Sequence, residues 1–189
     1  GSARVAGGLG SIPRVVGEGI DIYARRLPVD ETLLRIEQVY KPFHQALRSH
    51  IQSLQQEFGY CVLMDCHSMP SSVRSGERNA TPDIIIGDRF GMSAQTWISD
   101  LAVETFQSLG FSVTRNKPYA GGYITEHYGR PVRGSHALQI EINRGLHLDE
   151  TTLLLTSGFA SLRQAIGRFA LAFGDEVGSN LGFSRLAAE

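Results

Sequence analysis

A histidine and a carboxylate stand two residues apart in Asp65-Cys66-His67-Ser68, directly after a short apolar run. In an extended strand, side chains two residues apart point to the same side, so Asp65 and His67 would lie together and Cys66 would face away. A histidine there can bind a metal ion through one ring nitrogen while the carboxylate orients its ring. The alternative is a hydrogen-bonded histidine at a capped strand end, which this motif by itself favours.

A second candidate lies in the alternating segment 138–143. Its polar residues Gln139, Glu141 and Asn143 would share one face of a strand, opposite three aliphatic side chains. That face could line a cleft, where Glu141 would serve as general base for a metal-bound water. It could also be the solvated outer face of a sheet, and the alternation taken alone favours this second interpretation.

The third candidate is the segment 118–131, which contains the pair Gly121-Gly122 among tyrosine, threonine, histidine and arginine side chains. Glycines allow a left-handed backbone or close approach of the backbone to a ligand. The polar side chains could orient a polar substrate. The spacing is not that of a phosphate-binding loop. For any single residue of this segment, an ordinary surface loop is the favoured interpretation.

The hydrophobic pattern around these candidates predicts alternating helices and short strands. A helical pattern runs from Asp30 to Gly59, with a kink or break at Pro42. Further helices are expected over 94–109, capped by Ser93, and from Asp149 or Thr151 to about 173. Strands are expected at 60–66, 83–87, 111–115 and 137–143. Residues 116–136 are expected to form a loop. This alternation predicts an α/β domain with helices packed on a sheet.

Composition limits the class of protein. The 189-residue chain is 42% hydrophobic, which excludes a disordered polymer. A net charge of −1 removes the general electrostatic argument for binding nucleic acid or an anionic membrane. No apolar run approaches the roughly 20 residues of a membrane-spanning helix. Cys61 and Cys66 would lie on opposite faces of a strand and could not pair, and two free thiols predict a cytoplasmic protein.

Five segments, taken in order, resemble the N-formylglutamate amidohydrolase family. They are 8–14, 65–70, 82–88, 118–125 and 136–144, and the similarity extends from residue 8 to about 170. This family is similar to zinc-dependent carboxypeptidases and to aspartoacylase-type deacylases. The resemblance implies a three-layer α/β fold of the zinc exopeptidase or phosphorylase/hydrolase-like kind, with helices flanking a central mixed sheet, and one catalytic zinc ion.

The resemblance also implies roles for particular residues. His67 would be a zinc ligand, Asp65 its hydrogen-bonding partner, and Glu141 the carboxylate that activates water. Zinc would lower the pKa of its water and polarise the formyl oxygen, and N-formyl-L-glutamate would be hydrolysed to formate and glutamate, a reaction of histidine degradation. Because the substrate carries two carboxylates, arginines are needed to bind it. The expected substrate-binding residues are Arg14, Arg144, Tyr123, Thr125 and His136.

The chain departs from the family pattern at its start. Family members begin with a strand and a Pro-His-x-Gly-like turn, followed by an acidic residue, and by resemblance to the carboxypeptidases these supply two further zinc ligands. None of this precedes residue 8, and Gly1-Ser2 is typical of the remnant of a cleaved tag. We therefore expect a single domain over 3–175 without that first segment, a tail over 176–189, an incomplete zinc site and an exposed sheet edge.

Two other functions remain open at this point. One is a metal-free domain on the same fold that binds a small dicarboxylate without turnover. The other is a related zinc peptidase or cell-wall amidase, because one architecture serves many substrates. The expected partner is a small-molecule N-acyl amino acid substrate.

Overall fold

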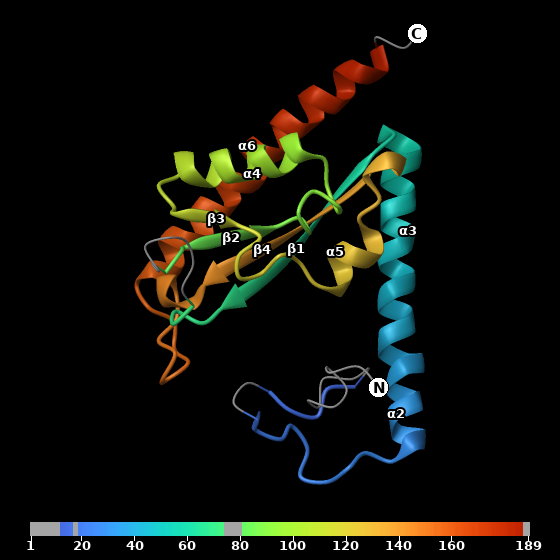
Figure 1. Ribbon diagram of the computed structural model, residues 1–189, viewed down its shortest axis with the longest axis vertical. Helices are drawn as coiled ribbons and strands as arrows, with labels where there is room; N and C mark the ends of the chain where they lie inside the picture. The colour runs from blue at the N-terminus through green and yellow to red at the C-terminus, as the bar shows by residue number, and fades with distance from the viewer. Residues whose placement is uncertain (1–11, 17–18, 74–80, 187–189) are drawn as a thin grey trace. The chain divides into compact units, whose positions relative to one another are not determined.

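The computed structural model describes residues 12–16, 19–73 and 81–186. The chain divides into two compact units, residues 1–50 and residues 51–189. The single domain predicted over 3–175 stays a prediction. The whole sheet and the helices that cover it belong to the second unit (Figure 1). Among the described residues, no helix is long and apolar enough to cross a membrane.

The predicted long helical segment is present, and its break is confirmed. It consists of α2 (Val29–Arg35), a π-helical turn η2 (Ile36–Tyr40) and α3 (Lys41–Phe58). Pro42 has no backbone N–H to donate to the preceding turn, so the regular helical ladder changes directly before it. The predicted stop at Gly59 is also confirmed, because this residue has a left-handed backbone (φ +83°) and its N–H donates to Gln55 O.

The second unit is built on a mixed four-stranded sheet, as the resemblance implies. Its strands are β1 (Cys61–Met69), β2 (Ile84–Gly87), β3 (Val113–Arg115) and β4 (Ser135–Asn143), in the spatial order β1-β4-β2-β3. β1 and β4 are parallel, β2 and β3 are parallel, and β4 and β2 are antiparallel. In the described part of the chain, β1 therefore forms one edge of the sheet and β3 the other.

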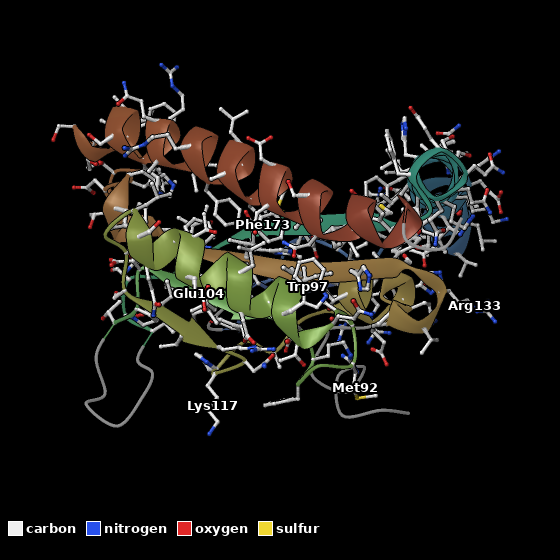
Figure 2. All side chains as sticks on the ribbon, turned by 90° about the horizontal axis from the view of Figure 1, so that it is seen from above. Met92, Trp97, Glu104, Lys117, Arg133 and Phe173 are labelled. Carbon is white, nitrogen blue, oxygen red and sulfur yellow. The ribbon has the colours of Figure 1, made fainter. Side chains whose placement is uncertain are left out.

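Two helices cover one face of the sheet and form the core with it. They are α4 (Thr96–Ser108) and α6 (Gly158–Leu186), which lie side by side in Figure 1 and Figure 2. Phe106 of α4 stacks on Phe169 of α6 with ring centroids 3.8 Å apart. The core side chains of the sheet and of these helices are Ile84, Ile86, Leu138, Ile140, Ala94, Ile98, Ala102, Phe106, Phe169, Phe173 and Val177. Burying these apolar side chains is the main force that holds the unit together.

A shorter helix, α5 (Tyr123–Tyr128), packs against β4 and β1. It lies on the other face of the sheet from α4 and α6 (Figure 1). The predicted three-layer α/β arrangement with a central mixed sheet is thus confirmed. Two short 3-10 turns flank β4, η3 (Pro131–Arg133) before it and η4 (Arg144–Leu146) after it.

The predicted ends of α4 and α6 are wrong. At the start of each helix, a local hydrogen bond takes the place of the predicted helix cap. Helix α4 starts after Gln95, because the hydroxyl of Ser93 donates to Ala137 O instead of capping a helix. Helix α6 starts at Gly158, because the Asp149 carboxylate accepts the N–H groups of Thr151 and Thr152 in a turn of its own. The helix then continues to residue 186, past the start of the tail predicted over 176–189.

Candidate active site

The parallel pairing of β1 with β4 places the predicted zinc ligand next to the predicted general base. His67 is the register partner of Glu141, and Asp65 is the register partner of Gln139. Paired positions in a sheet point to the same face, so these four side chains form one polar row. We call this side of the two strands the polar face. The prediction that Asp65 and His67 point to one side and Cys66 to the other is confirmed. Strand β1 extends to Met69, so His67 lies inside it and not beyond its end.

The polar side chains of β4 are buried. Gln139 is 6% exposed, and Glu141 and Asn143 are each 7% exposed. The solvated outer face that the alternation favoured is therefore wrong, and the cleft interpretation stays a prediction. Part of the cover is α5, which packs on β4. A carboxylate in such a setting is held away from bulk water, which suits a group that must exchange a proton with a bound substrate.

The predicted general base and the predicted zinc ligand each contact the side chain two positions before them in the strand. Gln139 Nε2 donates to Glu141 Oε1 over 2.7 Å. His67 Nε2 lies 3.0 Å from Asp65 Oδ2, and the His67 side chain is 48% exposed. These contacts leave Glu141 Oε2 and His67 Nδ1 for other partners. The alternating pattern placed Gln139 on this face, but nothing in the sequence identified it as the partner of Glu141.

The glycine-rich loop lies directly against the sheet beside this row. Gly87 of β2 is the register partner of Gln139. A Cβ on Gly87 would come within 2.8 Å of the Ala120 carbonyl carbon and of the Gly121 nitrogen. A Cβ on Gly122 would lie 3.2 Å from Gln139 Oε1. Because glycines occupy positions 87 and 122, the loop backbone can come this close to the sheet and to Gln139.

Two of the predicted substrate-binding residues belong to α5. Thr125 is fully buried, and its hydroxyl donates to Gly122 O over 2.9 Å, which closes the first turn of the helix. Tyr123 is half-exposed and stacks on the ring of His127 with centroids 5.2 Å apart. Both residues lie close to the glycine-rich loop, and their contact with substrate stays a prediction.

His136 is on β4, but the structure does not bring it to Glu141. The two residues are five positions apart in an alternating strand, so their side chains point to opposite faces. His136 is buried, and its Nδ1 accepts the N–H of Gln95 over 3.4 Å. Burial lowers the pKa of this imidazole, which keeps the ring neutral and able to accept.

Arg144 follows β4 immediately and lies at the carboxyl ends of both parallel strands. Its Nε donates to Ser68 Oγ over 3.2 Å and its Nη2 to Ser68 O over 3.3 Å. Its carboxylate neighbour, Glu150, is 4.0 Å away. The guanidinium is partly exposed and mostly bound to neutral oxygens. Its positive charge is therefore only weakly compensated, and it can attract an anion.

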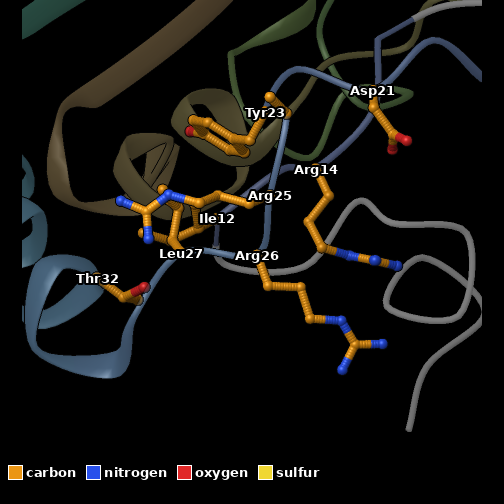
Figure 3. Close-up of a pocket in the computed structure, with 9 residues that line it drawn as sticks. Ile12, Arg14, Asp21, Tyr23, Arg25, Arg26, Leu27 and Thr32 are labelled. Atoms are coloured by element: carbon orange, nitrogen blue, oxygen red, sulfur yellow. The ribbon is translucent and has the colours of Figure 1, made fainter.

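Arg14 lies in the other unit, residues 1–50, where it lines a hollow of about 670 Å³. Figure 3 shows the guanidinium groups of Arg14 and Arg26 on one side of this segment and that of Arg25 on the other. The residues around the hollow are Ile12, Arg14, Asp21, Tyr23, Ala24, Arg25, Arg26, Leu27 and Thr32. The predicted binding of a substrate carboxylate by Arg14 stays a prediction.

A buried carboxylate that the sequence reasoning did not select organises the loop after β2. Asp88 is fully buried and accepts hydrogen bonds from Arg115 Nε and Nη2, Ser99 Oγ, Asn116 Nδ2 and Gly91 N. Burial alone would raise the pKa of Asp88, but these hydrogen bonds outweigh it and hold the pKa below its usual value. Asp88 is thus an ionised anchor for the loop.

Comparison with known proteins gives a consistent result. A sequence profile described as N-formylglutamate amidohydrolase matches residues 2–148. Among curated relatives, the N-formylglutamate deformylase of Pseudomonas putida is 32% identical over 145 residues and that of Pseudomonas aeruginosa 29% over 144. Each alignment covers 75% of this chain and 54% of the relative. The chain therefore spans about half the length of the curated relatives it matches.

Two solved structures share the fold. The crystal structure of N-formylglutamate amidohydrolase from Ralstonia eutropha JMP134 matches with a TM-score of 0.86 and 31% identity, covering 95% of this chain and 65% of that one. The gene product Atu2144 from Agrobacterium tumefaciens matches with a TM-score of 0.58 and 20% identity, covering 88% and 62%. The second likeness is one of fold alone.

Proposed function

This chain belongs to the N-formylglutamate amidohydrolase family, and from that premise we propose that its polar face hydrolyses N-formyl-L-glutamate, or a close N-acyl amino acid, to formate and the free amino acid. The observation that carries the proposal is the pairing of His67 with Glu141 on neighbouring parallel strands. The curated relatives are named N-formylglutamate deformylases, which supports this choice of substrate.

Glu141 is the general base in this proposal. It takes a proton from the attacking water, whose oxygen bonds to the formyl carbon. It then passes the proton to the amide nitrogen as the carbon–nitrogen bond breaks, which leaves formate and the free amino group of glutamate. Gln139 holds one carboxylate oxygen of Glu141, so the other is directed to the water. Arg144 is the candidate among the predicted residues for binding a substrate carboxylate beside this row.

His67 is the one zinc ligand that this proposal names. A catalytic zinc ion needs about three protein ligands. Over residues 12–16, 19–73 and 81–186, no three side chains of the metal-binding kinds come together. The described residues therefore do not fit a complete zinc site, and no step above passes through the metal. Because Nε2 of His67 lies against Asp65, we assign Nδ1 as the atom that would bind zinc.

The setting of the reaction is part of the same proposal. The free thiols of Cys61 and Cys66 support a cytoplasmic location. A role in histidine degradation, which the family resemblance implies, is part of the same proposal.

The test is formate release from N-formyl-L-glutamate by the chain supplied with zinc and then desalted. We expect turnover by the parent chain and by Glu104→Gln, a control on exposed α4 surface (Figure 2), and none by Glu141→Gln with its fold intact. Turnover by Glu141→Gln at the parental rate would refute the assignment of the base. No formate from the parent chain would refute the hydrolase proposal for this chain and favour a dicarboxylate-binding domain.

A further inference from the structure

Arg89 lies just beyond β2 and packs against the glycine-rich loop. Its N–H donates to Ala120 O over 2.7 Å. A Cβ on Gly121 would lie only 3.1 Å from Arg89 Cγ, so the glycine makes room for the arginine side chain. At its far end, Arg89 Nη2 lies 3.4 Å from the Glu126 carboxylate on α5. Arg89 directly follows the segment 82–88 that resembles the family.

The backbone that presents Arg89 is strained and held from several sides. Arg89 and Phe90 both have left-handed φ values, +54° and +57°. The N–H groups of Asp88 and Phe90 both donate to Asn116 Oδ1, over 3.0 and 3.3 Å. The buried Asp88 carboxylate also binds the N–H of Gly91. Two consecutive strained residues persist only where the surroundings fix them, and such strain gathers at ligand sites.

A short series of contacts connects Arg89 to the proposed general base. Arg89 N–H donates to Ala120 O, and a Cβ on Gly122, two residues further along this loop, would lie 3.2 Å from Gln139 Oε1. Gln139 in turn donates to Glu141. Arg89 thus lies against the same glycine-rich loop that approaches Gln139, the partner of Glu141.

The present partner of Arg89 is easily replaced. The Glu126 side chain is 63% exposed and that of Arg89 is 30% exposed, and an ion pair this open to water contributes little to stability. A guanidinium binds a carboxylate best through two parallel N–H···O bonds, a geometry that a small free carboxylate can adopt. At 3.4 Å the contact with Glu126 is longer than such charge-assisted bonds usually are.

We propose that Arg89 binds a carboxylate of the substrate at the glycine-rich loop, while Glu141 acts on the amide, and that Glu126 occupies Arg89 until the substrate replaces it. This rests on the proposed function, whose substrate carries two carboxylates separated by a short carbon chain. Arg89 is the residue that binds one of these carboxylates, and Glu126 weakens substrate binding because it competes for Arg89.

The test is a calorimetric titration of the full chain with glutarate, a dicarboxylate with no amide to cleave. We expect the Kd to rise about tenfold or more in Arg89→Gln and by less in Arg89→Lys, and to fall severalfold in Glu126→Gln. Gln and Lys, like Arg, pay the cost of the left-handed backbone, so both variants should keep the fold. Arg133→Ala is the matched control, because Arg133 is exposed and points outward (Figure 2).

The inference is overturned if the parent chain does not bind glutarate saturably, if Arg89→Gln binds it as the parent does, or if Glu126→Gln fails to tighten binding. Formate release on the same samples separates this inference from the proposed function. Turnover with an unchanged KM for N-formyl-L-glutamate in Arg89→Gln overturns the role of Arg89 alone. Arg89-dependent glutarate binding without any formate release upholds that role and overturns the hydrolase proposal.

Discussion

At the scale of single residues, the polar face contains two polar contacts, each between side chains two positions apart in the same strand: a hydrogen bond from Gln139 to Glu141 and the 3.0 Å approach of His67 Nε2 to Asp65 Oδ2. The bond from Gln139 to Glu141 is the buried one, and it costs little to form because both side chains already point the same way along β4. A proton-transferring carboxylate gains from such a partner, because one of its oxygens is fixed and the other is directed at the water.

Gln139→Leu should therefore slow formate release without weakening substrate binding. The substitution keeps the volume roughly but leaves Glu141 Oε1 without its donor. We expect kcat to fall about tenfold, equivalent to about 1.4 kcal/mol, with KM nearly unchanged. Steady-state kinetics with N-formyl-L-glutamate measure both constants. Gln107→Leu on the exposed surface of α4 is the control and should match the parent. An equal decrease of kcat in Gln139→Leu and Gln107→Leu would contradict the positioning role of Gln139.

At the scale of elements, the turn between β2 and α4 is held by one buried charge. Asp88 binds Arg115 of β3, Asn116 directly after it and Ser99 of α4, so a single carboxylate joins β3 and α4 to the loop that carries Arg89. Arg115 also pairs with Asp100, whose side chain is half-exposed. One arginine thus has a buried carboxylate partner and an exposed one, which allows the two to be compared.

The Asp88 network should make the fold sensitive to acid. Because the pKa of Asp88 is lowered in the folded state, its contribution is fully present above the unfolded value, near pH 4, and is lost as the pH falls through the lower folded value. Urea unfolding followed by circular dichroism at pH 7 and below pH 4 measures this loss. We expect the unfolding free energy to decrease over that interval.

Two variants isolate the contribution of Asp88 from that of other carboxylates. Asp88→Asn should lower the unfolding free energy at pH 7 by about 2–4 kcal/mol, because it removes a buried charge from its hydrogen-bonded partners. It should also show a smaller loss below pH 4 than the parent. Asp100→Asn removes only the exposed partner of Arg115 and should cost about 1 kcal/mol or less. Equal effects of the two variants would contradict the role given to Asp88.

The elements also show how far sequence reasoning reaches. Alternation in 138–143 and in 65–67 identified which side chains share a face, because a strand has a period of two. It could not identify that His67 pairs with Glu141, because strand order and register depend on contacts between distant segments. Helix α5 was missed because it is only six residues long and follows two glycines. The start of α6 was misplaced because Asp149 is as good a turn residue as it is a helix cap.

At the scale of the whole molecule, the two units differ in how they are stabilised. Every buried apolar side chain in the described part of the chain belongs to residue 51 or a later one. The large core residues Phe106 and Phe169 stack on each other within the second unit. Residues 12–16 and 19–50 contribute no apolar side chain to a core, so the hydrophobic stabilisation of the molecule resides in the second unit.

Residues 41–189, which keep α3 whole, should therefore fold without residues 1–40. The described residues of that deleted segment, 12–16 and 19–40, include no core side chain, so we expect one cooperative unfolding transition and a change in unfolding free energy of less than about 2 kcal/mol. Phe106→Ala in the full chain is the contrasting change, because it empties a fully buried site and should cost about 3–5 kcal/mol. Urea denaturation of both proteins gives the comparison. If the shortened chain unfolds without cooperativity while Phe106→Ala stays near the parent, the stability resides in contacts of the first forty residues and not in the sheet and its helices.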